Sequence, residues 1–186
     1  MNELELSKRI KNHDPEAYKE LYNQYAPFLY ATIVRYVVNP EKAKDLLHDT
    51  FLRIFEKSAL FTYQSSGSLK AWITRIAINE CMKLFRAEKK LKFLPLDERD
   101  DKDTSDENAI VDESDVDNIP EEVIQEMINR LPEGYRLVFN LYVIDGKNHK
   151  EIADILEINE KSSSSQLARA KKKLAQEICN WRKTNG

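Results

Sequence analysis

Short hydroxyl side chains followed by cations stand out in a C-terminal segment of this chain. Residues 146–178 predict a helix, a tight turn and a second helix that ends in a basic run. The second helix has an apolar stripe at steps of three and four, made of Leu167, Ala170, Leu174, Ile178 and Trp181. Its other faces carry Ser164, Ser165, Arg169, Lys172 and Lys173. Such a helix suits the major groove of DNA, where N-terminal residues meet base edges and cations hold phosphate.

The connection before this helix has the composition of a turn. Asn159 and the residues up to Ser162 supply turn and N-cap chemistry. Ala153 on the preceding helix is small enough for the second helix to cross closely. A plain helical hairpin is the alternative, because cations are also favourable in the last turns of any helix.

A second pattern that could do chemistry lies on a long helix predicted to begin with Ser68 as its cap. The apolar side of this helix is Ile73, Ala77, Cys81 and Leu84. The opposite stripe consists of Trp72, Arg75, Asn79, Lys83, Arg86 and Lys90. Single-stranded nucleic acid needs a flat face for stacking, cations for phosphate and an amide for a base edge. The alternative is that Trp72 belongs to the core and the cations form a solvated face.

Start signals place the helices that must hold these residues. Asp14 followed by Pro15, and Asn39 followed by Pro40, are typical of a helix N-terminus. The helix from Pro40 to about Lys57 is expected to bury Ala43, Leu46, Leu47, Phe51 and Ile54. Its other face gathers Asp45, His48, Asp49, Leu52 and Glu56. A surface leucine among acids indicates a protein partner.

Composition and charge divide the chain in two. Its 186 residues include only 4 glycines and are 33% charged, which favours an all-α protein. The net charge of −3 arises from residues 97–117, where 11 acidic residues meet only Arg99 and Lys102. Such a segment cannot bury enough surface to fold alone. We expect two helical domains, at residues 1–93 and 120–186, joined by a flexible acidic linker at residues 94–119.

Several classes of protein are disfavoured. No apolar run is long enough to span a bilayer and no signal peptide is evident, so we expect a cytoplasmic protein without membrane insertion. Cys81 and Cys179 lack metal-ligand spacing and are expected to be buried free thiols, with no metal or other cofactor. With 3 scattered histidines and no Gly-rich phosphate loop, neither an enzyme nor a small-molecule substrate is expected.

Both halves together resemble a sigma factor of the extracytoplasmic function type, group 4 of the sigma-70 family. Region 2.2 of that family is similar to AKDLLHDTFLRIFEK at residues 43–57. Regions 2.3 and 2.4 are similar to GSLKAWITRIAINECMKLFRAEKK at residues 67–90, and region 4 is similar to residues 130–174. The specific part is the spaced W-I-x-R-I-A-x-N at residues 72–79 followed by the distant RAKKKL. The serine-rich second helix is similar to members from Bacteroidetes-like bacteria.

The resemblance implies a bacterial protein that brings core RNA polymerase to promoter DNA. Family region 2.2 grips the largest polymerase subunit, which implies a role for Asp45, His48, Asp49 and Leu52. Capture of a flipped minus-10 base implies roles for Phe61, residues 62–69 and Asn79. The separated strand would lie on Trp72, Arg75, Lys83, Arg86, Lys89 and Lys90. The minus-35 element would meet Ser162, Ser164, Ser165, Ala168, Arg169 and Lys172, with Ala168 against a thymine methyl group.

Some positions depart from the family pattern. Glu157 stands where the family turn has Gly, a position that often needs a left-handed backbone. Ser163 and Ser164 stand where an apolar residue and a cation are common. We therefore expect minus-35 recognition to rely on hydroxyls, water and DNA shape.

Two rival functions are open from the sequence. A stand-alone helix-turn-helix regulator would leave the stripe that begins at Trp72 and the acidic face around Asp45 unused. A sigma-like decoy for an anti-sigma factor would not need the cations that this chain retains. The favoured reading has core RNA polymerase, promoter DNA and an anti-sigma factor as partners.

Overall fold

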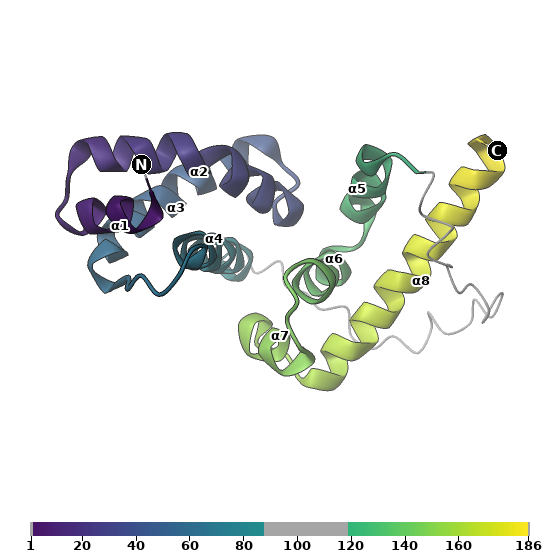
Figure 1. The fold of residues 1–186 in the computed structure, drawn as a ribbon. Helices are drawn as coiled ribbons and strands as arrows, with labels where there is room; N and C mark the ends of the chain where they lie inside the picture. The colour runs from purple at the N-terminus through teal and green to yellow at the C-terminus, as the bar shows by residue number, and fades with distance from the viewer. Residues whose placement is uncertain (1, 88–118, 186) are drawn as a thin grey trace. The chain divides into compact units, whose positions relative to one another are not determined.

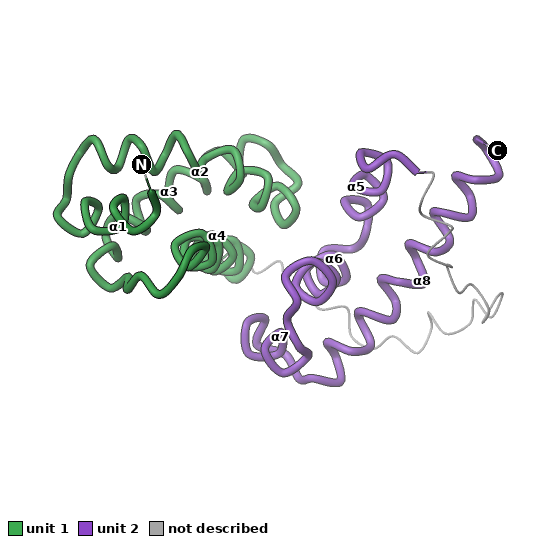
Figure 2. The backbone as a smooth tube through the Cα atoms, viewed as in Figure 1, with its two compact units in different colours: residues 1–87 green, residues 88–186 purple. Residues whose placement is uncertain are grey.

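The computed structural model describes residues 2–87 and 119–185, and within them every regular element is helical (Figure 1). The chain divides into two compact units, Met1–Ala87 and Glu88–Gly186 (Figure 2). The predicted all-α class with two helical domains is confirmed. The acidic residues 97–117 lie outside the described residues, so the linker and the domain limits at residues 93 and 120 stay predictions.

Unit 1 consists of helices, several of which begin at side-chain caps. Its described elements are α1 (Glu3–Lys11), α2 (Pro15–Tyr36), α3 (Pro40–Lys57), the 3-10 helix η1 (Ser58–Leu60) and α4 (Ser68–Ala87). Asp14 Oδ1 accepts from the N–H of Glu16 at 3.0 Å, and Asn39 Oδ1 accepts from the N–H of Lys42 at 3.0 Å. The predicted starts of α2 and α3 are therefore confirmed.

The core of unit 1 lies where α2, α3 and α4 pack against one another. Its most enclosed side chains include Leu21, Leu29, Ile33, Tyr36, Ile54, Ile73, Ala77 and Cys81. Burying an aliphatic side chain of this size stabilises the fold by roughly 1.5–3 kcal/mol. The same packing fixes which faces of α3 and α4 remain in water.

The start of α4 is stabilised differently from the prediction. Ser68 is the first helical residue, but its hydroxyl accepts from the N–H of Gln64 at 3.3 Å and not from a helix N–H. The N–H groups of Gly67 and Leu69 donate to the Glu3 carboxylate, at 2.6 and 2.5 Å. The cap of α4 therefore comes from α1, and the prediction of Ser68 as the cap was wrong.

Unit 2 is built around one long C-terminal helix. Its described elements are α5 (Glu121–Arg130), α6 (Glu133–Phe139), the π-helical segment η4 (Asn140–Ile144), α7 (His149–Leu156) and α8 (Glu160–Asn185). α8 packs against α5, α6 and α7. Its predicted stripe is confirmed, because Leu167, Ala170 and Leu174 are buried while Ile178 and Trp181 pack against the core of α5 and α6.

A buried arginine joins α5 to α6. Arg136 is 8% exposed, and its Nη1 donates to the carbonyls of Asn129 and Leu131 at 3.4 and 3.3 Å. Loss of water around the guanidinium lowers the pKa of Arg136 below its usual range. The side chain thus satisfies carbonyls at the end of α5 that have no partner within that helix.

The two cysteines differ in burial. Cys81 is buried, as predicted, but Cys179 is exposed, which corrects the expectation of two buried thiols. Position 179 follows Ile178 by one residue, a rotation of about 100° around a helix. That step carries Cys179 off the buried stripe of α8.

The turn between α7 and α8 is defined by side-chain caps and one left-handed residue. Asn148 and Glu151 form a reciprocal capping box at the start of α7, with both hydrogen bonds at 2.9 Å. Glu157 ends α7 with φ 58° and ψ 43°. Asn159 Oδ1 accepts from the N–H of Ser162 at 2.6 Å at the start of α8. The expected left-handed position and the expected N-cap are both confirmed.

Glu157 offers a direct test of backbone strain in this turn. A left-handed backbone costs a residue with a Cβ atom roughly 1–2 kcal/mol, so Glu157→Gly should raise the free energy of unfolding of unit 2 by about 0.5–1 kcal/mol. Chemical denaturation, followed by a spectroscopic signal from residues of unit 2, measures the change in the free energy of unfolding. Glu157→Ala is the matched control, since it removes the same carboxylate but keeps the Cβ. An equal gain from both variants would show that charge, and not backbone strain, is responsible.

Candidate polymerase and nucleic-acid interface

The acidic side of α3 stays in water along its whole length. We call Asp45, His48, Asp49, Leu52 and Glu56 the α3 face, and all five are exposed. Leu52 has 59% of its surface in solvent, whereas Leu46 and Phe51 on the other side of α3 are buried. The core of unit 1 therefore does not account for a leucine at position 52.

A surface hollow of about 250 Å³ lies beside the α3 face, between α3 and α4, and is lined by Asp49, Leu52, Arg53, Glu56 and Glu80. Arg53 donates to Glu56 at 2.8 Å and lies 3.6 Å from Glu80. One apolar side chain is thus surrounded by three carboxylates, whose charge Arg53 neutralises only in part. This arrangement fits an apolar side chain of a partner that is flanked by cations.

The predicted DNA-binding side of α4 is largely solvent-accessible. We call its described members, Trp72, Arg75, Asn79, Lys83 and Arg86, the α4 stripe. Trp72 is half-buried and the other four are exposed. Lys83 Nζ lies 2.6 Å from the largely buried Glu80 carboxylate, but half of the Lys83 side chain is exposed, so its cation can also meet a phosphate. Lys89 and Lys90 lie outside the described residues.

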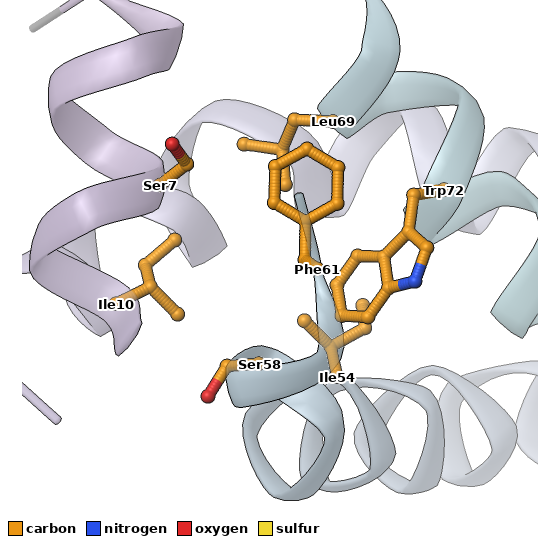
Figure 3. A pocket seen from close by; sticks show the side chains of 7 residues that line it. All are labelled: Ser7, Ile10, Ile54, Ser58, Phe61, Leu69 and Trp72. Carbon is orange, nitrogen blue, oxygen red and sulfur yellow. The ribbon is translucent and has the colours of Figure 1, made fainter. Parts of the chain in front are cut away.

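Phe61 and Trp72 meet at the start of the α4 stripe. Their ring centroids are 5.1 Å apart with an angle of 43° between the planes, and both line a small cavity with Leu69 (Figure 3). Phe61 is only 5% exposed, so its ring supports Trp72 from within. Asn79 lies two turns further along α4, about 10 Å from Trp72 by helix geometry.

The proposed DNA-reading residues of α8 lie away from its buried stripe. The α8 surface comprises Ser162, Ser164, Ser165, Ala168, Arg169 and Lys172. Ser164, Ala168 and Lys172 are exposed, and the other three are half-buried. Ser165 Oγ donates to the carbonyl of Lys161 at 2.9 Å, which leaves its oxygen as an acceptor toward solvent. The surface therefore offers hydroxyls near the start of the helix and cations one to two turns later.

A hydrogen bond that the sequence patterns did not predict ties α7 to α8. Ser163 is fully buried, and its Oγ lies 2.9 Å from His149 Nδ1. The His149 ring stacks on Tyr142, with centroids 4.8 Å apart and planes 25° apart. Ser163 thus makes a polar contact at a position where family members commonly place an apolar residue. This contact helps to set the rotation of α8 and so the direction of the α8 surface.

A metal cluster and a membrane span are both absent from the part of the chain that the structure describes. Residues 2–87 and 119–185 contain no cluster of three or more His, Cys, Asp or Glu side chains able to hold a metal ion. No helix in those ranges is long and apolar enough to cross a membrane.

Two family models match this chain in the same order as its two units. Residues 21–91 match sigma-70 region 2, and residues 121–174 match sigma-70 region 4. Together these matches cover about two thirds of the chain. The chain belongs to the sigma-70 family, and neither matching model describes an enzyme.

Similar proteins narrow the class to RNA polymerase sigma factors of the extracytoplasmic function (ECF) type. The chain is 29% identical to the ECF sigma factor SigM of Bacillus subtilis over 156 residues, which cover 83% of this chain and 91% of SigM. It is 23% identical to SigW of the same species, covering 92% of this chain and 94% of SigW. The chain is therefore a sigma factor of this type, as predicted. The likeness to Bacteroidetes-like members stays a prediction.

Solved structures share the fold. RpoE in complex with the anti-sigma factor NepR from Bartonella quintana matches with a TM-score of 0.52 at 21% identity, covering 87% of this chain and 96% of that chain. CnrH in complex with the cytosolic domain of CnrY matches with a TM-score of 0.50 at 18% identity, covering 94% of this chain and 96% of that chain.

Proposed function

We propose that this chain directs core RNA polymerase to promoters and opens them, with the work divided among three surfaces. The α3 face would bind polymerase, the α4 stripe would hold the separated minus-10 strand, and the α8 surface would read the minus-35 duplex. The observation that carries the proposal is that all three surfaces reach solvent while other sides of the same helices are anchored in a core. Folding alone does not require these three surfaces.

Polymerase binding is assigned to the α3 face because its leucine is exposed among carboxylates and is not needed by the core of unit 1. Interfaces commonly combine a buried apolar anchor with complementary charges around it. Leu52 would supply the anchor, and Asp45 and Asp49 would supply the charges. The hollow beside Leu52 extends the same surface toward Glu80 of α4.

Replacing both Asp45 and Asp49 with Lys should weaken binding to core polymerase by about 100-fold or more, because like charges would then face each other across the interface. Gel filtration or a fluorescence titration with purified core measures the affinity, and circular dichroism checks that helical content is unchanged. The control carries the same change in net charge on exposed acids of unit 2, through Glu122→Lys and Asp154→Lys. Equal affinity of the α3 variant and the control would refute the assignment.

Promoter opening is assigned to the α4 stripe because it joins a half-exposed ring, an exposed amide and cations on one side of a helix. Opening costs a few kcal/mol of unstacking, which stacking and hydrogen bonding to the protein can offset. Trp72 would stack on a base, Asn79 would bind a flipped base, and the cations would hold phosphates. Phe61 would act indirectly, because its buried ring packs against Trp72.

Asn79→Ala should leave core binding and closed-complex formation nearly normal, yet lower open-complex formation on duplex DNA by about three- to tenfold, since a hydrogen bond to a base is lost. Permanganate reactivity of thymines at the minus-10 element measures opening. A template with a pre-melted bubble should restore most of the activity. Thr74→Ala, on α4 but off the stripe, is the control. Failure of the bubble to rescue Asn79→Ala would mean that Asn79 is structural.

Minus-35 recognition is assigned to the α8 surface, with Arg169 as its central cation. Its hydroxyls and single small side chain, Ala168, give fewer direct charge contacts than a recognition helix rich in cations would. Water-mediated contacts and DNA shape would then carry part of the specificity.

Arg169→Ala should weaken promoter binding by roughly 1–3 kcal/mol if Arg169 contacts a base, and should flatten the salt dependence if it contacts phosphate. Footprinting of the holoenzyme at several salt concentrations distinguishes the two. Lys183→Ala, at the far end of α8, is the control for loss of one cation. A normal footprint over the upstream element in Arg169→Ala would place recognition elsewhere.

The remaining parts of the proposal follow from this activity. The protein would act in the cytoplasm, where polymerase and DNA are, and would not be an enzyme in its own right. An anti-sigma factor is a further proposed partner, supported by the similar structure of RpoE, which was solved in complex with the anti-sigma factor NepR. A decoy that binds only an anti-sigma factor would not need exposed cations at Arg75 and Lys172, and a stand-alone DNA regulator would not need the α3 face.

A further inference from the structure

The loop between η1 and α4, residues 61–67, comes directly before the α4 stripe and has one buried end, at Phe61. Residues 64–67 are exposed. Two local bonds order its end, from Ser68 N to Ser65 O at 3.1 Å and from Gln64 N to Ser68 Oγ at 3.3 Å. Gly67 adopts φ +87°, a conformation that favours glycine. Short local bonds of this kind, in water, do not hold a loop in one place.

Glu3 supplies a long-range contact at the end of the loop that adjoins α4. Its Oε2 accepts from the N–H of Gly67 at 2.6 Å, and its Oε1 accepts from the N–H of Leu69 at 2.5 Å. Both oxygens of one carboxylate are therefore bound to backbone donors more than 60 residues away in sequence. These donors lie at the N-terminus of α4, where a negative charge is favourable because of the helix dipole.

The buried side of α1 lies beside the first residue of the same loop, Phe61. Ile10 is buried, and Ser7 and Ile10 line the small cavity with Ser58, Phe61 and Trp72 (Figure 3). α1 also packs against η1 directly. One short helix thus contacts the loop at both ends, at Phe61 and at Gly67.

We propose that Glu3 is a positioning residue for promoter opening, which holds residues 61–67 and the first turn of α4 so that Trp72 is preorganised to receive an unstacked base. The inference rests on the proposed role of the α4 stripe. Trp72 lies three residues after Leu69, which is one helical turn, so any movement of the first turn moves its ring. A binding site that becomes ordered only when the base binds has a weaker affinity, because part of the binding free energy is lost in ordering it.

The test combines a measurement on the free protein with one on the promoter complex. Hydrogen exchange of the Gly67 and Leu69 amides, followed by NMR in the full chain, reports the two Glu3 contacts directly. Glu3→Ala should speed exchange at both amides and slow open-complex formation on duplex DNA by about tenfold, with recovery on a pre-melted bubble. Glu3→Gln, which keeps the shape and one good acceptor, should fall between wild type and Glu3→Ala. Glu5→Ala, an exposed acid of the same helix, should match wild type.

Three results would overturn the proposal. Unchanged exchange at Gly67 and Leu69 in Glu3→Ala would mean that the contacts do not hold the loop in solution. Faster exchange with normal opening of duplex DNA would make Glu3 purely structural, as would an equal loss on duplex and bubble templates accompanied by weaker core binding. If the wild-type protein opened no promoter, the proposed function of the α4 stripe would be refuted instead. That result is seen with the wild-type protein and does not depend on the Glu3 variants.

Discussion

Each functional helix of this chain is anchored through its buried side, and the accessibility of the proposed binding residues depends on that side packing into a core. In α8 the stripe that includes Leu167, Ala170 and Leu174 packs against α6 and α7, which turns Ser164 and Lys172 to solvent. In α3 the burial of Leu46 and Ile54 leaves Leu52 exposed among carboxylates. Because burial of one such side chain is worth roughly 1.5–3 kcal/mol, and surface charges far less, the surfaces can vary in chemistry without disturbing the fold.

Side-chain caps fix where these stripes begin, and thereby which residues fall on which face. Asp14 and Asn39 start α2 and α3, and Asn148 and Asn159 start the two helices of the helix-turn-helix. A shift of one residue at a helix start would rotate every later side chain by about 100°. The same turn tolerates a left-handed Glu157 in place of glycine, so its geometry is imposed by the packing of α7 on α8.

Local signals allowed the sequence to predict most of this fold, and contacts between distant residues account for what it missed. The starts of α2 and α3, the exposed side of α3 and the buried stripe of α8 each follow from residues within a few turns. Glu3 could not be recognised as the cap of α4, because its partners lie 64 and 66 residues away. The burial of Ser163 depends on His149 reaching across from α7, and α1 is a short helix whose contacts with the loop after η1 have no pattern in sequence. The resemblance implies base capture by Phe61, and only the structure shows that its buried ring packs against Trp72.

In the proposed function, one chain, through the exposed sides of helices whose other sides are buried, enables core polymerase to choose and open promoters. The most direct measurement is transcription in vitro on fragmented bacterial genomic DNA, with core polymerase alone or with this protein added, and with the 5′ ends of the transcripts mapped. We expect new start sites that appear only with the protein and share two upstream sequence elements at a constant spacing. No starts beyond those of core alone, or new starts that share no upstream elements, would contradict it.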